Sequence, residues 1–141
     1  MPLKSFIFYG SLKDPRRQID ILGSAPVEVM EGFIHGDIYV VTDTTDPFEV
    51  FVYPIVILGE EKPSVPAILA MVEVSNDGEY KKIIDSLLRF EGDLFRVSEA
   101  PFHRMDGSIS CGIVFVAIEN AIMDHRVHKP DPQYIYKLGT G

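Results

Sequence analysis

The chain contains 141 residues, of which 46% are hydrophobic, and carries a formal net charge of −8 at pH 7. Such a chain is expected to form one domain, residues 1–141, with an extended tail from about residue 123. The negative charge disfavours nucleic acid and anionic membranes as partners, because phosphates are bound by clustered Lys and Arg side chains. No apolar run is long enough to cross a bilayer and no signal-peptide layout is present, so a cytoplasmic protein is expected.

The metal-ligating and nucleophilic side chains form no pattern typical of a metal site. Cys111 is the only cysteine, which excludes an intrachain disulfide and a cysteine-based zinc cluster. It lies in a strand-like stretch, where we expect a small core residue. His125 and His128, preceded by Asp124, are spaced like a pair of metal ligands, but the polar tail offers no clear further ligand. We therefore expect no metal site.

The first predicted elements are a strand and a short helix. Residues 5–9 are aromatic and β-branched, which favours a buried strand. Asp14 is a good N-cap for a helix that ends near Gly23. Ile19 and Leu22 are three residues apart, so we expect both on the buried face of this helix.

Strands dominate the rest of the chain. Gly32 and Gly36 are expected to bend one long strand, and Pro54 places its strand at a sheet edge or a bulge. Asp106-Gly107 predicts a hairpin turn. The predicted strands cover residues 27–41, 48–58, 65–74, 95–104 and 109–118. This content predicts an α+β fold whose strongly curved sheet is barrel-like.

The clearest helix signal covers residues 77–90. Asn76 and Glu79 resemble a capping box, and Gly92 is a plausible C-cap. The apolar residues at helical spacing are Tyr80, Ile83, Ile84, Leu87 and Leu88. This helix is expected to pack on one side of the sheet or to close one end of it.

The first candidate site is the stretch Tyr9-Gly10-Ser11-Leu12, where a strand turns toward a helix. Such a turn can aim successive backbone N–H groups in one direction and so bind an anion. Lys13, Arg16 and Arg17 follow and could add positive charge. An ordinary strand-to-helix turn is the alternative interpretation.

The second candidate is Glu91, which continues the buried stripe of the long helix beyond Ile84 and Leu88. A carboxyl group in an apolar cleft has a raised pKa and suits general acid/base catalysis near neutral pH. The alternative is a frayed, solvated helix end. Arg96 could pair with Glu91 or bind a carboxylate, and a surface role is the other option.

In this order and spacing, the Tyr9-Gly10-Ser11-Leu12 and Phe90-Glu91-Gly92 motifs resemble the γ-glutamylcyclotransferase-like family. Tyr53-Pro54 also resembles a step of that family, and the similarity runs from about residue 5 to residue 118. The resemblance implies a small mixed β-barrel with one long and one or two short flanking helices. It also implies a small-molecule γ-glutamyl substrate that is cyclised to 5-oxoproline with release of an amine. The implied reaction needs no metal or organic cofactor.

The same resemblance implies roles for the two candidate sites. Glu91 would act as general base and then as general acid, and the Tyr9 to Leu12 loop would hold the glutamyl group with backbone N–H donors. Arg96 is the further candidate for substrate binding. A small-metabolite-binding module without turnover, or an amide-cleaving relative on the same scaffold, remains an alternative. Neither the leaving amine nor the oligomeric state follows from the sequence.

Overall fold

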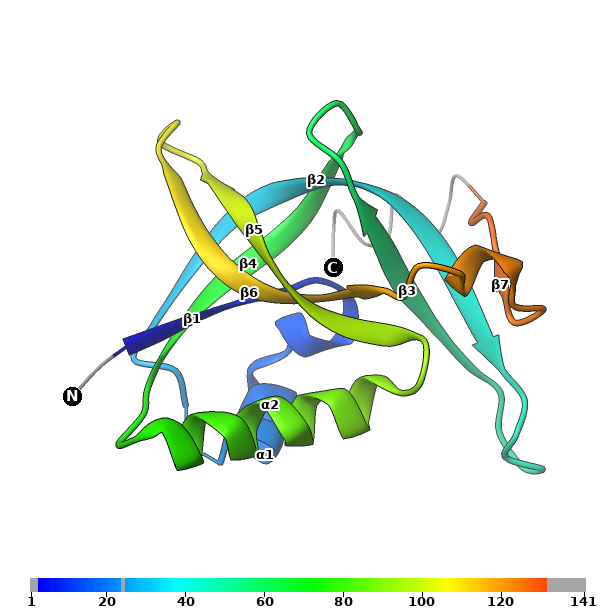
Figure 1. The fold of residues 1–141 in the computed structure, drawn as a ribbon, viewed down its shortest axis with the longest axis horizontal. Helices are drawn as coiled ribbons and strands as arrows, with labels where there is room; N and C mark the ends of the chain where they lie inside the picture. Colours follow the sequence, from blue (N-terminus) through cyan, green and yellow to red (C-terminus); the bar gives the residue numbers. More distant parts are fainter. Residues whose placement is uncertain (1–2, 24, 132–141) are drawn as a thin grey trace.

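The computed structural model describes residues 3–23 and 25–131 (Figure 1). Among these residues the chain forms seven strands, two α-helices and two short 3-10 helices. In chain order the elements are β1 (Leu3–Phe8), η1 (Gly10–Lys13), α1 (Pro15–Leu22), β2 (Glu28–Asp43), β3 (Phe51–Leu58), β4 (Ser64–Glu73), α2 (Asp77–Glu91), β5 (Phe95–Arg104), β6 (Ile109–Ala117), η2 (Ala121–Met123) and β7 (Val127–His128).

Five of the described strands close into a barrel. The order is β2-β4-β1-β6-β5, and β5 pairs again with β2 through Phe33 and His103. The β1–β6 pair is parallel and the other pairs are antiparallel, so the sheet is mixed. The prediction of an α+β fold with a small mixed barrel is confirmed. In Figure 1, both α-helices lie on one side of the barrel, while the β3–β4 and β5–β6 hairpins point the other way.

The long strand β2 belongs to two sheet segments. Its first half, to His35, pairs with β4, and its second half, from Gly36, pairs with β3. At Gly32 an added Cβ would lie 2.2 Å from the backbone oxygen of His103, because β5 closes the barrel at that point. At Gly36 it would lie 2.5 Å from Cγ1 of Val56. Both glycines therefore mark close approaches within the long strand.

Strand β3 runs along the edge of this segment. The sequence predicted it from residue 48, but the structure starts it at Phe51 and leaves Phe48 exposed in the β2–β3 hairpin. Two side-chain acceptors within this turn hold the intervening residues away from strand geometry, since Asp43 accepts from the N–H of Thr45 and Asp46 accepts from the N–H of Phe48. Because Pro54 has no N–H to donate, the edge position suits it.

The two α-helices begin with side-chain caps. Asn76 accepts a hydrogen bond from the N–H of Glu79, and Glu79 in return binds the N–H of Ser75, so the predicted capping box is present in a shifted form. Asp14 caps α1 through the N–H of Arg16. Helix α2 buries Leu87 and Ile83 against the barrel, as expected from their spacing.

Two predictions of burial are wrong. Ile19 is exposed, and helix α1 buries Gln18 together with Leu22. This helix has only two turns, and the pair four residues apart faces the barrel. Cys111 is also exposed, because it alternates with the buried positions Gly112 and Val114 along β6 and therefore lies on the opposite face of the strand.

The tail is only partly extended within the described residues. Ala121–Met123 forms a 3-10 turn, and Val127–His128 pairs with β2 as strand β7. The remainder of the predicted tail, residues 132–141, lies outside the described residues. In the part of the chain that is described, no helix is long and apolar enough to cross a membrane.

Replacing Gly32 by alanine should weaken the closure of the barrel. The added methyl would meet the backbone of His103 and the ring of Phe102, neither of which can move without disturbing the sheet. We expect the free energy of unfolding to fall by about 1–3 kcal/mol in urea denaturation. Gly78→Ala is the control, since only the side-chain oxygen of Asn76 lies near, at 3.2 Å, and alanine favours a helix. Equal effects of the two changes would contradict this account.

Candidate functional site

Glu91 is the last residue of helix α2. It follows the fully buried Leu87 by one helical turn, so its side chain lies on the barrel side of the helix and is half-buried. The helix ends at Gly92, whose N–H binds the carbonyl of Leu88 at 2.9 Å. The positive φ of Gly92, 105°, lets the chain turn away from the helix there. The helix end is thus capped, and the carboxyl group is held beside the barrel.

A cavity of about 510 Å³ opens beside Glu91. The volume lies within the range typical of small-molecule sites. Its walls come from α1, the end of β2, the beginning of β3 and the end of α2. The lining residues are Arg17, Asp43, Phe51, Val52, Tyr53, Arg89, Phe90, Glu91, Gly92 and Asp93. The core aromatics Phe8 and Phe95 are not among them, so neither fills this space.

Burial raises the pKa of the Glu91 carboxyl from 4.5 to about 7. Removal from water disfavours the charged form, and desolvation is the cause of this shift. Near neutral pH the group is therefore present in both protonation states. A carboxyl with this property can accept a proton and return it without a large energetic penalty.

Tyr9 is fixed by its hydroxyl group. The phenol donates to the carbonyl oxygen of Phe115 at 2.5 Å and accepts from the N–H of Val56 at 3.3 Å. It therefore bridges β6 and β3, which are not hydrogen-bonded to each other in the sheet order. Burial and the nearby Glu91 carboxylate hold the pKa of Tyr9 well above its usual value, so the phenol stays neutral.

Gly10 connects the Tyr9 to Leu12 loop with β3. Its φ of +73° belongs to the left-handed region, and an added Cβ would lie 2.6 Å from Cγ of Pro54. Tyr53, the residue before Pro54, lines the Glu91 cavity. The structure thus brings the three motifs that the sequence analysis singled out, around Gly10, Tyr53 and Glu91, to one region. The backbone of Ser11 and Leu12 lies in η1, directly after Gly10.

The two arginine candidates occupy different places. Arg17, which the sequence offered as a source of positive charge, lines the cavity. Arg96 is exposed and is not among the lining residues given for this cavity. Its neighbour Phe95 is buried and lies against the ring of Tyr53, with 6.0 Å between ring centroids. Alternation along β5 therefore directs Arg96 away from Tyr53.

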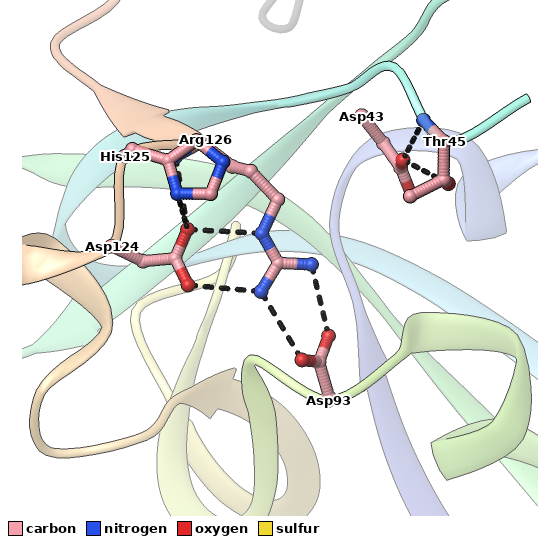
Figure 2. A network of polar contacts seen from close by, with 6 residues as sticks. All are labelled: Asp43, Thr45, Asp93, Asp124, His125 and Arg126. Carbon is pink, nitrogen blue, oxygen red and sulfur yellow. Dashed lines mark hydrogen bonds and ion pairs between the residues drawn. The ribbon is translucent and has the colours of Figure 1, made fainter.

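An arginine-centred network lies at the same end of the molecule (Figure 2). The guanidinium of Arg126 donates to both oxygens of Asp93 at 3.1 and 3.2 Å and to both oxygens of Asp124 at 2.9 Å. These bonds hold the pKa of both carboxyls below its usual range. They join the segment before β7 to the turn just after Glu91. No sequence pattern indicates this contact, because Arg126 and Asp93 are far apart along the chain.

Two of the tail residues considered as metal ligands make hydrogen-bond contacts with other side chains. Asp124 is bound by Arg126, and Nε2 of His128 lies 2.7 Å from Oγ1 of Thr42. Tyr53 lies near this group of charges, and its pKa is raised by burial and then by the Asp43 carboxylate.

The solved structures show which fold this is. No protein-family model and no curated protein matches the chain. At5g39720.1 from Arabidopsis thaliana matches with a TM-score of 0.64 at 19% identity, over 97% of this chain and 82% of that one. A γ-glutamyl cyclotransferase matches with a TM-score of 0.63 at 12% identity, over 94% and 74% of the two chains. Allophanate hydrolase from Kluyveromyces lactis matches with a TM-score of 0.57 at 9% identity, over 92% of this chain but 20% of that one.

These matches establish the architecture. The chain has the α+β barrel fold of γ-glutamylcyclotransferase-like proteins.

The raised pKa of Glu91 should make stability fall as pH rises. The folded protein holds a proton on Glu91 up to about pH 7, whereas the unfolded chain loses it near pH 4.5. Folding is therefore disfavoured by roughly 1–3 kcal/mol at pH 8 relative to pH 4, with allowance for partial solvent exposure. Urea denaturation of Glu91→Gln should lack this part of the pH dependence. The same pH slope for wild type and Glu91→Gln would contradict the raised pKa.

Tyr9→Phe should destabilise the protein through its lost hydroxyl. The carbonyl of Phe115 and the N–H of Val56 would lose this buried partner, at a cost of about 1–3 kcal/mol in the free energy of unfolding. Tyr80→Phe is the matched control, because the ring of Tyr80 would still pack on Phe6 and under the Lys4 ammonium. An unchanged midpoint for Tyr9→Phe in thermal denaturation would show that the bridge adds no stability.

Proposed function

We propose that this chain is a γ-glutamylcyclotransferase. The single observation that carries the proposal is a half-buried carboxyl, Glu91, with a pKa of about 7 beside an open cavity. The position of Gly10 against Pro54, next to Tyr53 in the cavity wall, supports it. The fold is the one that a γ-glutamyl cyclotransferase also has. Together these features favour cyclisation of a γ-glutamyl amine or peptide to 5-oxoproline.

The reaction requires two proton transfers. The α-amine of the substrate attacks its own γ-carbonyl carbon, and a new C–N bond closes a five-membered ring. Glu91 accepts a proton from the attacking amine. The original amide C–N bond then breaks, and Glu91 returns a proton to the departing amine. Holding the glutamyl chain in a folded conformation supplies the proximity that the free substrate lacks. The reaction needs no cofactor.

The binding role of the loop rests on the family resemblance, and that of Arg17 rests on the cavity lining. Backbone N–H groups of the Tyr9 to Leu12 loop would hold the glutamyl group, and Tyr9 keeps this loop in place through its bonds to β3 and β6. Arg17 is the cation in the cavity wall that suits the substrate α-carboxylate. The earlier candidate for this role, Arg96, would need to reach the cavity from the other side of β5.

The test is release of 5-oxoproline from a panel of γ-glutamyl amines and dipeptides. We expect turnover of at least one compound and a loss of roughly a hundredfold or more in kcat for Glu91→Gln, because the acid/base is removed. The wild-type kcat/KM should rise with pH up to about 7, as Glu91 becomes able to accept a proton. Glu119→Gln, at an exposed site beyond β6, is the control.

Retained turnover in Glu91→Gln would place the catalytic role elsewhere. No turnover by folded wild type, combined with binding of a panel member, would favour the alternative of a metabolite-binding module.

A further inference from the structure

Large apolar side chains surround the Glu91 cavity without being buried by the protein. Phe51 is 46% exposed, Val52 is 52% exposed and Phe90 is 43% exposed, and all three line the cavity. Single exposed apolar residues are normal on a protein surface, but a group around one cavity is not. The group combines residues from the beginning of β3 and the end of α2, which only the fold brings together.

Two acidic side chains of the same wall, Asp43 and Asp93, already have partners. Asp93 is bound at both oxygens by Arg126, and Asp43 accepts from the N–H and hydroxyl of Thr45. Figure 2 shows both arrangements. These carboxylates are therefore poorly placed to bind a positively charged leaving group. The exposed apolar side chains are the part of the wall that still has apolar surface in contact with water.

The reaction geometry places the leaving amine near these residues. In the proposed reaction the γ-carbonyl lies at Glu91, and the α-carboxylate lies at Arg17 in the same cavity wall. The amine portion must leave in another direction, and Phe51, Val52 and Phe90 stand around the cavity beside Glu91.

Building on the proposed cyclotransferase activity, we propose that the leaving amine bears an apolar or aromatic side chain. This side chain packs on Phe51, Val52 and Phe90. The enzyme thereby prefers γ-glutamyl compounds of hydrophobic amines or amino acids over those of small or charged ones. Removal of apolar surface from water on both partners drives the preference.

The measurement is kcat/KM for γ-glutamyl-phenylalanine and γ-glutamyl-leucine against γ-glutamyl-glycine and γ-glutamyl-lysine. We expect the hydrophobic pair to be preferred by roughly tenfold or more, as hydrophobic contacts in a substrate pocket commonly discriminate. Phe51→Ser with Phe90→Ser should remove most of this preference, measured as the ratio of kcat/KM between the hydrophobic pair and the other two compounds. Because both side chains are substantially exposed, the variant should fold, and its thermal midpoint checks this.

Phe48→Ser is the matched control. Phe48 lies on the same hairpin and is 96% exposed, but it does not appear in the cavity wall. The Phe48→Ser variant should leave the preference for hydrophobic leaving amines unchanged. The same loss of preference in Phe48→Ser would overturn the inference, because general hydrophobicity of the hairpin would then be responsible.

Other outcomes separate this inference from the proposed function. Equal turnover of all four compounds, still dependent on Glu91, would overturn the inference and leave the cyclotransferase proposal intact. A change in sedimentation from dimer to monomer in the double variant, without a change in selectivity, would overturn it in favour of an interface between copies. No 5-oxoproline from folded wild type would overturn the proposed function and, with it, this inference.

Discussion

The bent strand β2 is the constraint on which the rest of the structure depends. It pairs with β4 and β5 in the barrel and then, beyond Gly36, with β3 and β7 outside it. The close contact of Gly32 with His103 closes the barrel. Because the second half of the strand leaves the barrel, it carries β3 toward the end of helix α2. The cavity beside Glu91 is the space between these parts.

Burial of the Glu91 carboxyl in this arrangement costs free energy. A carboxylate removed from water is unfavourable, so the group takes up a proton at a higher pH than an ordinary glutamate. Nearby carboxylates do not have this property, because Asp93 is solvent-exposed and bound by Arg126. Glu91 and Asp93 lie only two positions apart, yet the pKa of Glu91 is raised and that of Asp93 is lowered. A difference in pKa between neighbouring carboxyl groups is typical of sites where one group must exchange protons and another must stay charged.

Contacts between distant segments hold the site in shape. Tyr9 ties its loop to β3 and β6, and Arg126 ties the segment before β7 to the turn after Glu91. The first contact is buried and neutral, whereas the second is a charged pair nearer to solvent. Salt should therefore weaken the second more than the first. Similar folds exist at very low sequence identity, so the architecture tolerates wide variation in sequence.

The sequence by itself determined most elements and the residues of interest. Spacing of apolar residues gave helix α2 and its buried face, Asn76 and Asp14 gave the helix starts, and β-branched runs gave the strands. These are local properties, set by the period of each element and by neighbouring backbone groups. The same period placed Glu91 next to the buried stripe.

Only the tertiary structure decided what lies around Glu91. The exposure of Ile19 and Cys111 depends on which faces other elements cover, and a sequence pattern records periodicity without recording the partner. The pairing of Arg126 with Asp93 and the meeting of Phe51 with Phe90 at one cavity join residues that are distant along the chain. Such contacts arise when the barrel closes, because closure and desolvation are properties of the whole fold.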